Sequence, residues 1–301
     1  MKFINWILFI ALSVIWGSSF ILMKEGMKVL SPYQVAALRI ASAGIVLLPF
    51  IIKAWKQIPR NKVVAVILSG LIGNFIPAFL FCVAEIKVDS SIAGILNALT
   101  PLFTIIVGFM FFNMQSSPRK IIGVIIGFIG LILLFTGGGK IDFKNISYSL
   151  LILVATVLYG ININFVGKHL KEIGSLNIVS VALGILIIPC LLILFFTGYF
   201  KFQFTQTAFL LSTSAGCLLG IMGTAVATIL YYRLLKTAGA LFATMVTYAI
   251  PVVAVLLGLL INEKITVQIV VSLLIIILGV YIVNTTANKN PFSLKRKRDV
   301  E

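Results

Sequence analysis

Charged side chains are scarce in this sequence of 301 residues: Asp, Glu, Lys and Arg together account for 11% of it, and histidine occurs once. A soluble domain carries about 25% charged residues. Hydrophobic residues make up 60% of the chain, and its mean hydropathy is +1.16. This composition excludes an ordinary soluble globular protein. It also excludes intrinsic disorder, which requires low hydrophobicity.

The residue types that carry most enzyme chemistry are equally sparse. The single histidine, His169, adjoins Lys168 and is expected to be a solvated loop residue. Cysteines 82, 190 and 217 lie in apolar runs without CxxC spacing, which is typical of small buried residues. The sequence contains no HExxH motif, metal-ligand cluster or glycine-rich phosphate loop. We therefore predict no enzyme activity, no cofactor and no metal site.

Long apolar runs fill the chain instead. Each approaches or exceeds the roughly 20 residues that a membrane-spanning helix needs. Barrel strands would be about ten residues long with alternating polarity, so we interpret these runs as helices and predict an all-α membrane protein. The ten runs cover residues 4–23, 33–52, 63–84, 91–112, 121–137, 147–166, 176–197, 208–232, 240–261 and 267–285.

Basic residues outnumber acidic ones by 24 to 8, for a net charge of +16. In a soluble chain this excess would suggest nucleic-acid binding. Here the basic residues lie in short breaks between apolar runs, where they determine topology and not nucleic-acid affinity. The largest clusters occupy segment 53–62 and the tail 289–301, whose KRKR sequence at 295–298 suits contact with anionic lipid. An even number of spans places both termini on one side, and these clusters predict the cytoplasmic side.

An internal repeat divides the chain. A constant shift of 150 residues pairs glycines and prolines of the third and fourth runs with those of the eighth and ninth: Gly70 with Gly220, Gly73 with Gly223, Pro101 with Pro251, and Gly108 with Gly258. A shift of 143 pairs Trp16-Gly17 of the first run with Tyr159-Gly160 of the sixth. The second and seventh runs match poorly. Glycine and proline have specific backbone roles, so these matches exceed what shared hydrophobicity would give.

Each half therefore has five spans, and an odd number means that the second half enters the membrane in the opposite orientation. We predict two inverted five-helix repeats, residues 1–145 and 146–288, followed by a basic cytoplasmic tail at 289–301. Inverted repeats are a recurrent plan of secondary transporters, because two similar halves can exchange conformations around a central site. A duplicated scaffold without transport activity is the alternative.

Several motifs resemble those of the drug/metabolite transporter superfamily, specifically its EamA-type ten-helix members. In the first half the matching features are WGSSF at 16–20, Lys24, Pro32, Arg39, Gly70, Gly73 and the segment 101–108. In the second half they are GIMGTAVATILYYRLLK at 220–236, Pro251 and INEKIT at 261–266. One position departs from the pattern, because Glu263 of the second half corresponds to Asn113 in the first.

The resemblance implies a bacterial inner-membrane carrier of a small metabolite, such as an amino acid or a related solute, and favours export. An exchanger of organic phosphates or nucleotide sugars is an alternative, but it would need several cations in the cavity. A membrane receptor or scaffold is the alternative from another class. Substrate identity, coupling ion and the choice between monomer and homodimer stay open.

Uncharged polar and aromatic side chains of the repeat-matched spans are candidates for a shared central path to a small-molecule substrate. Hydrogen bonding between helices is the alternative role, worth about 0.6–2 kcal/mol for each bond. Asn164 adds a further amide, and Pro101 and Pro251 are expected to break their helices and free a carbonyl. The fifth and tenth spans contain almost none of these groups and are expected at the periphery, with Gly123, Gly127 and Gly130 serving helix packing within the chain. The candidate substrate-binding residues are Trp16, Asn74, Asn97, Tyr159, Asn162, Thr224 and Tyr248.

Ionisable groups inside the spans are nearly absent. Arg39 lies within the second span, where it could oppose an anionic substrate or bond a carbonyl near the membrane boundary. Glu25, Glu85 and Glu263 fall at helix ends, and no Asp or Glu lies in mid-span. This pattern argues against a buried carboxylate switch, although Glu85 or Glu263 could still titrate at a cavity mouth.

The predicted topology can be tested by cysteine labelling at Gln57 and Ser293, which lie in the two largest positive clusters. We expect an impermeant thiol reagent to label neither position in intact cells and both in permeabilised cells. Labelling of both positions from outside would reverse the orientation.

Overall fold

The computed structural model describes residues 3–112, 118–135, 143–231, 233–234 and 246–285, and its secondary structure in those ranges is entirely helical. The first repeat contains α1 (Phe3–Gly26), α2 (Pro32–Gln57), η1 (Arg60–Lys62), α3 (Val63–Gly70), η2 (Leu71–Phe75), α4 (Ile76–Ala84), α5 (Ser90–Asn97), α6 (Thr100–Phe111) and α7 (Pro118–Phe135). The second contains α8 (Phe143–His169), α9 (Ser175–Phe196), η4 (Tyr199–Lys201), α10 (Thr207–Gly220), η5 (Ile221–Val226), α12 (Val246–Leu260) and α13 (Val267–Thr285).

In the described ranges these helices correspond to the ten apolar runs, and residues 136–137, 232 and 240–245 of those runs lie outside the described residues. Seven helical segments are long and apolar enough to cross a membrane, and three shorter apolar helices cover 121–134, 249–260 and 267–282. Side chains such as Ile188, Phe196 and Leu260 are more than two-thirds exposed on the outer surface, where they suit contact with lipid. The protein is therefore an all-helical membrane protein, as its composition predicts.

Two of the predicted spans have irregular interiors. The third consists of α3, the π-helical turn η2 and α4 in direct succession. The fourth is divided at Ala98 and Leu99, and α6 resumes with Pro101 in its first turn, so the predicted break near Pro101 is confirmed. The predicted break at Pro251 is wrong, because α12 runs through it from 246 to 260. Proline removes one backbone hydrogen bond, which a helix held by neighbours can lose without ending.

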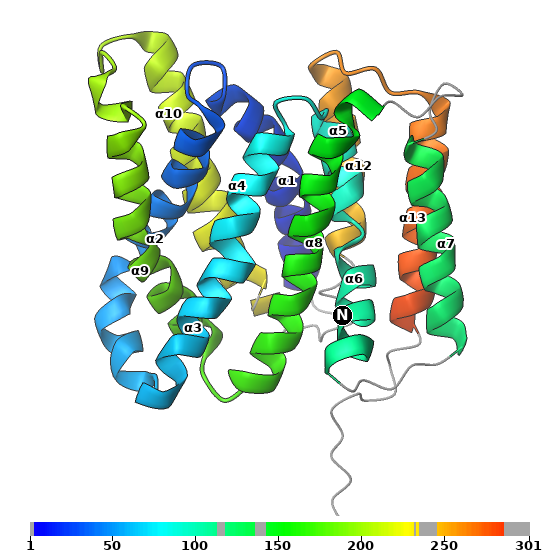
Figure 1. Cartoon of the computed structure of the whole chain (residues 1–301), viewed down its shortest axis with the longest axis horizontal. Helices are drawn as coiled ribbons and strands as arrows, with labels where there is room; N and C mark the ends of the chain where they lie inside the picture. The colour runs from blue at the N-terminus through cyan, green and yellow to red at the C-terminus, as the bar shows by residue number, and fades with distance from the viewer. Residues whose placement is uncertain (1–2, 113–117, 136–142, 232, 235–245, 286–301) are drawn as a thin grey trace, which may run out of the picture.

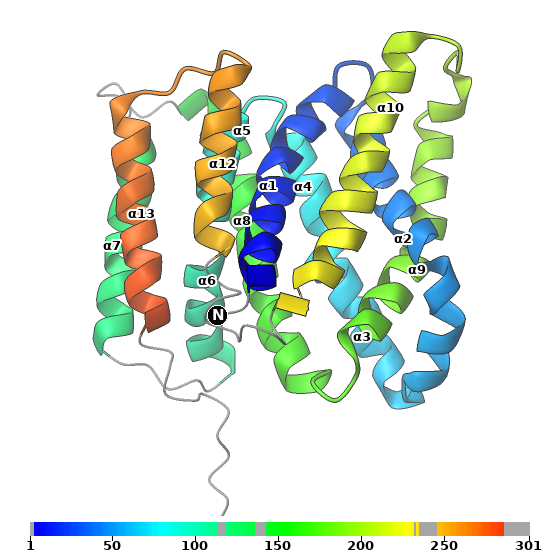
Figure 2. The same ribbon diagram turned by 180° about the vertical axis from the view of Figure 1, so that it is seen from behind.

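The two repeats are inverted. Figure 1 shows α1 and α8 running in opposite directions, as do the span of α3, η2 and α4 and the span of α10 and η5. Packing follows the same symmetry: α2 packs on α9, α7 on α13, α1 on α12, and α8 on α6. In Figures 1 and 2, α7 and α13 stand together at one edge of the molecule, which confirms their predicted peripheral position.

Close backbone approaches repeat under the same shifts as the sequence. A Cβ atom placed on Gly17 would lie 2.6 Å from Val253 Cβ, and one placed on Gly160 would lie 2.9 Å from the backbone carbonyl carbon of Phe103. Gly17 and Gly160 differ by 143 positions, and Phe103 and Val253 by 150. The glycines therefore allow the first helix of each repeat to pack closely against the fourth span of the other repeat.

The second and seventh spans obey this symmetry although their sequences match poorly. Gly70 faces the backbone of Ala182 in α9, and Gly220 faces the carbonyl of Arg39 in α2. Arg39 and Ala182 are again 143 positions apart. Side chains on these helices have diverged, while the backbone contact has been kept.

The glycines of α7 pack inside the chain, as predicted. A Cβ on Gly279 of α13 would lie 2.5 Å from the Gly127 amide nitrogen and 2.7 Å from the Gly123 carbonyl oxygen. One on Gly130 would lie 2.8 Å from Ile276 Cγ1. Small residues thus bring α7 and α13 into backbone contact, which is a main source of helix association where lipid removes the hydrophobic driving force.

The close approach at Gly160 predicts a specific loss of stability. Gly160→Ala should destabilise the fold by about 1–3 kcal/mol, because the new Cβ meets backbone atoms of Phe103 and Thr104 that cannot rotate away. Gly127→Ala is the matched control, because its nearest neighbours are the terminal methyl groups of Leu102. Thermal melting in detergent measures both, and equal melting temperatures would contradict a required contact at Gly160.

Candidate functional site

Two π-helical turns, η2 and η5, lie at equivalent places in the two repeats, and each contacts the first helix of the other repeat. Trp16 of α1 donates its indole N–H to the carbonyl oxygen of Gly223 in η5, at 2.9 Å. A Cβ placed on Gly223 would also lie 2.9 Å from Ser19 Oγ. On the other side, a Cβ placed on Gly73 of η2 would collide with the amide of Asn162 in α8. Irregular helical turns of this kind are common at functional sites.

Arg39 is held at the boundary between the repeats. Its Nε donates to the hydroxyl of Thr224 in η5 at 3.1 Å, and Thr224 is buried. The guanidinium is thus anchored by a side-chain hydroxyl of the opposite repeat, which was not among the partners expected for it. Because this bond uses only Nε, the two terminal nitrogens of the guanidinium have further donors to offer.

The candidate residues of α8 differ in their environments. Tyr159 stacks on Phe81 of α4, with ring centroids 6.2 Å apart. Asn164 donates from Nδ2 to the carbonyl oxygens of Thr104 and Gly160, both at 2.8 Å, so it joins α8 to α6. Asn162 is different, because its Oδ1 is buried and has no hydrogen-bond partner among the described residues. A buried acceptor without a partner is costly, and a bound solute could satisfy it.

The remaining candidates are less closely connected. Asn74 is half-buried in η2, and its side chain makes no hydrogen bond within the described part of the chain. Asn97 lies at the interruption between α5 and α6, where its backbone carbonyl accepts from Thr100 Oγ1 at 2.8 Å. Tyr248 belongs to α12, but its side chain falls outside the described residues. The structure therefore groups Trp16 and Thr224 at η5, and Asn162 and Asn74 at η2.

A network of charges that sequence analysis did not assemble closes one end of the molecule. Lys24, at the end of α1, forms an ion pair with Glu263 at 2.9 Å and a longer one with Asp89 at 3.4 Å. Glu263, in the segment between α12 and α13, also accepts hydrogen bonds from the backbone N–H groups of Ser90 at 2.7 Å and Ser91 at 2.9 Å. Its carboxylate thereby caps α5 and joins the two repeats.

Lys24 was singled out by family resemblance, and Glu263 by that resemblance and as an acid at a helix end. Asp89 precedes α5 and is a typical N-cap residue, yet its side chain makes no capping bond. Glu263 supplies the cap from a site 173 positions away from Ser90. No local sequence signal could have revealed this partner.

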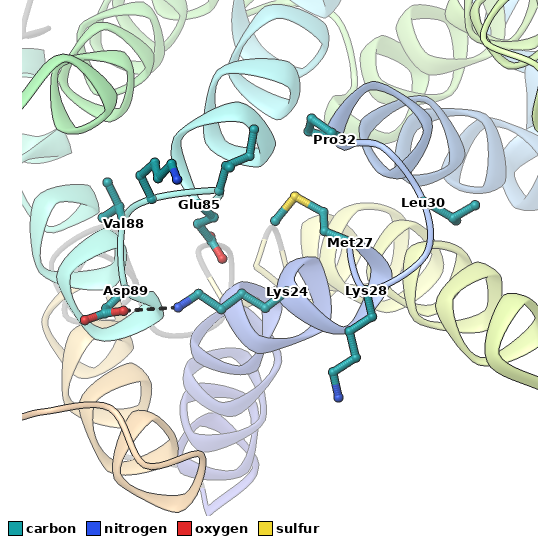
Figure 3. Close-up of a pocket in the computed structure, with 10 residues that line it drawn as sticks. Lys24, Met27, Lys28, Leu30, Pro32, Glu85, Val88 and Asp89 are labelled. Atoms are coloured by element: carbon teal, nitrogen blue, oxygen red, sulfur yellow. Dashed lines mark hydrogen bonds and ion pairs between the residues drawn. The ribbon is translucent and has the colours of Figure 1, made fainter. Parts of the chain in front are cut away.

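The same end of the molecule contains a cavity of about 550 Å³. Figure 3 shows Glu85 pointing into it toward Lys24. Glu85 follows the last residue of α4, as predicted for a helix-end acid, but it is only 3% exposed, and neither carboxylate oxygen has a hydrogen-bond partner among the described residues. The cavity is lined by Lys24, Met27, Lys28, Leu30, Pro32, Glu85, Ile86, Lys87, Val88 and Asp89.

The sequence argued against a buried carboxylate switch but left Glu85 open as an acid at a cavity mouth, and the structure places Glu85 at a cavity, where it is buried. Position at a helix end determines depth along the membrane normal, but it does not determine how far neighbouring segments cover a side chain. Here the segment after α4 and the end of α1 enclose the carboxyl group.

The surroundings of Glu263 and Glu85 shift the pKa values of these two acids in opposite directions. Burial favours the neutral form of Glu263, but hydrogen bonds from Ser91, Lys24 and Ser90 outweigh it and hold the pKa of Glu263 below its usual value. At Glu85, burial raises the pKa well above its usual range; the positive charge of Lys24 opposes the shift and the negative charge of Glu263 adds to it.

At the opposite end, residues next to the repeat-equivalent positions make a different contact. Lys168, near the end of α8, lies with its ammonium 5.5 Å from the centre of the Phe112 ring. Such a cation–π contact contributes about 0.5–1 kcal/mol at an exposed site. Asn113, the counterpart of Glu263, lies outside the described residues. The two ends of the molecule are thus chemically unequal.

Inverted five-helix repeats, π-helical turns facing the opposite repeat, and partly unsatisfied polar groups between them define a membrane protein of the ten-helix carrier type. The chain belongs to the EamA-like transporter family, whose model matches residues 4–136 and 146–285. The resemblance seen in its motifs is thereby confirmed.

Two relatives extend over most of the chain. An uncharacterized transporter of Archaeoglobus fulgidus is 27% identical over 284 residues, which cover 93% of this chain and 98% of that protein. The uncharacterized inner membrane transporter YedA of Escherichia coli K12 is 28% identical over 252 residues, covering 82% of this chain and 79% of YedA. A solved crystal structure superposes with a TM-score of 0.62 at 17% identity, covering 95% of this chain and 98% of the other, so the fold is shared.

The Glu263 network predicts pH-dependent stability. Because the folded-state pKa lies below its ordinary value of 4.5, the carboxylate stabilises the protein above that pH, and this contribution is lost as pH falls through the folded pKa. Glu263→Gln should therefore cost roughly 1–3 kcal/mol at neutral pH, and the cost should shrink on acidification. Melting temperatures across pH measure it, with the exposed Glu25→Gln as control; a cost that does not change with pH would contradict the assignment.

Proposed function

We propose that this protein is a secondary-active carrier that moves a small polar metabolite, such as an amino acid or a related solute, across the bacterial inner membrane by alternating access. The observation that carries the proposal is the reciprocal contact of the two π-helical turns: η2 with Asn162 of the second repeat, and η5 with Trp16 and Ser19 of the first. A change in one repeat therefore acts directly on the irregular backbone of the other.

Reciprocal contact between the two repeats supports alternating access for a physical reason. Inverted halves can exchange conformations, so that an opening on one side becomes an opening on the other. Irregular backbone at membrane depth is tolerated only where protein buries it or where it lines a cavity. The polar groups at η2 and η5 supply uncharged donors and acceptors for a solute, and Arg39 adds one positive charge between the repeats.

The membrane in which the protein lies and the direction of transport are supported by separate observations. The name of YedA places that relative in the inner membrane. The excess of basic residues in segment 53–62 and in the tail supports cytoplasmic termini. Export is the direction favoured by resemblance to EamA-type transporters.

Flux through the purified protein tests the proposal. Proteoliposomes loaded with a panel of unlabelled amino acids should accumulate the matching radiolabelled amino acid by counterflow, above the level in protein-free vesicles. Organic phosphates and nucleotide sugars form a second panel, and flux of these alone would favour the exchanger. Absence of flux in both panels would favour a receptor or scaffold and sink the carrier proposal.

Three asparagines separate solute binding from structural bonding. Asn162→Ala should weaken the affinity for the transported solute about 5- to 150-fold, because it removes a buried amide that has unmet hydrogen-bonding capacity. Asn164→Ala is the matched control on the same helix: it should lower the melting temperature and leave affinity nearly unchanged, because both hydrogen bonds from Asn164 Nδ2 go to backbone carbonyls. The solute affinity and melting temperature of Asn97→Ala are measured in the same way. If Asn162→Ala melts earlier but binds normally, Asn162 is structural.

A further inference from the structure

The cavity between the end of α1 and the α4–α5 connection contains a carboxyl group that the proposed solute path does not use. We propose that Glu85 is a proton-binding site and that its protonation state selects the partner of Lys24. The connection of this site to transport rests on the proposed function, whereas the binding of a proton at Glu85 does not.

The geometry of Glu85 distinguishes it from the other acids of this end. It is 3% exposed, both of its oxygens lack a hydrogen-bond partner among the described residues, and it points into a cavity of about 550 Å³. An ionised carboxylate so placed has lost its hydration without gaining donors, a state that costs several kcal/mol. The protonated acid avoids that cost, and the cavity offers a route for the proton to enter and leave.

The charged groups around Glu85 come from several elements. Lys24 belongs to α1, with Lys28 just after it; Lys87 and Asp89 belong to the α4–α5 connection. Arg39 of α2 and Glu263 of the α12–α13 segment also act on Glu85 electrostatically. Of these cations, Lys24 exerts the largest effect on Glu85, and Figure 3 shows the two side chains converging.

Lys24 already has partners in the structure. Their arrangement determines which ion pair would change when Glu85 gains or loses its proton. Its ammonium lies 2.9 Å from Glu263 and 3.4 Å from Asp89. While Glu85 is neutral, these acids hold Lys24. When Glu85 releases its proton to the cavity, a second buried carboxylate competes for the same ammonium, and Lys24 moves toward it. Lys24 stays protonated throughout, so the only proton exchanged is that of Glu85.

This exchange of partners would alter a contact between the two repeats. Glu263 would keep its bonds to Ser90 and Ser91 but would lose the bond that ties α1 to the segment between α12 and α13. Proton release at Glu85 would thereby loosen one closed end of the molecule. A proton gradient could drive a carrier through such a coupling.

Infrared spectroscopy of the full-length protein in lipid vesicles tests the site, with the proton as the only ligand. A carboxylic acid C=O band should persist at pH values where an ordinary Glu is already ionised, and should disappear as the pH is raised further. Glu85→Gln should abolish this band, whereas Glu25→Gln should leave it unchanged, since Glu25 is an exposed acid paired with Lys28. A band that survives in Glu85→Gln, or that is missing from the wild type, would overturn the proposal.

The role of Lys24 is tested in the same titration. Lys24→Met should move the midpoint upward by roughly 1 pH unit, because it removes the nearest positive charge. Lys28→Met is the matched control, since Lys28 is exposed and paired with Glu25, and it should move the midpoint much less. Should Lys24→Met fail to fold, Lys24→Arg replaces it and should keep the wild-type midpoint to within a fraction of a pH unit. Equal shifts for Lys24→Met and Lys28→Met, or a large shift for Lys24→Arg, would contradict this exchange of partners.

The outcomes separate this inference from the proposed function. A titrating Glu85 in a protein that gives no solute flux would retain the proton site and reject the carrier. Solute flux in a protein whose Glu85 does not titrate would retain the carrier and reject the proton site.

Discussion

Backbone-to-backbone contact between helices is the interaction on which the rest of this structure depends. In a bilayer, apolar side chains gain little by leaving lipid for protein, so helices associate through close packing and a few hydrogen bonds. Gly17, Gly160, Gly70 and Gly220 provide that packing at four equivalent places, and each would bring a Cβ atom to within 3.0 Å of the opposite repeat or helix. The positions of η2 and η5 follow, because the helices that face them are held by these contacts.

The polar side chains between these helices are of two kinds, those that are hydrogen-bonded within the described protein and those that are not. Asn164, Thr100 and Thr104 bond to nearby backbone carbonyls and complete the helices or join them. Asn162, Asn74 and Glu85 have hydrogen-bonding capacity that the described protein does not use. A buried polar group without a partner destabilises the fold, so these groups are candidate contacts for a bound solute or proton under the two proposals. The residues of the second kind are therefore the ones that carry the functional argument.

Much of the fold could be predicted from the sequence, because hydrophobic length and the shifts of 143 and 150 residues encode the spans and their inversion. The equivalence of α2 and α9 could not, since it survives as backbone contact at Arg39 and Ala182 and not as residue identity. The continuity of α12 through Pro251 depends on neighbouring helices, which a local rule does not include. At the candidate functional site, the presence of amide and aromatic side chains could be predicted from the sequence. The difference between Asn162 and Asn164, two positions apart, depends on which carbonyl each one reaches.

The unequal contacts at the two ends would have a consequence for the energies of the conformations that the proposed carrier visits. Two inverted repeats with identical sequences would generate inward-open and outward-open forms of equal free energy, by symmetry. Here a carboxylate that accepts four hydrogen bonds, from Lys24, Ser90 and Ser91, closes one end, while Lys168 lies above the Phe112 ring near the other. Under the proposed alternating access, the difference between Asn113 and Glu263 would remove that equality and give the unloaded protein a preferred resting conformation. Substitutions at the two ends could then bias such a cycle without any change to the symmetric backbone between them.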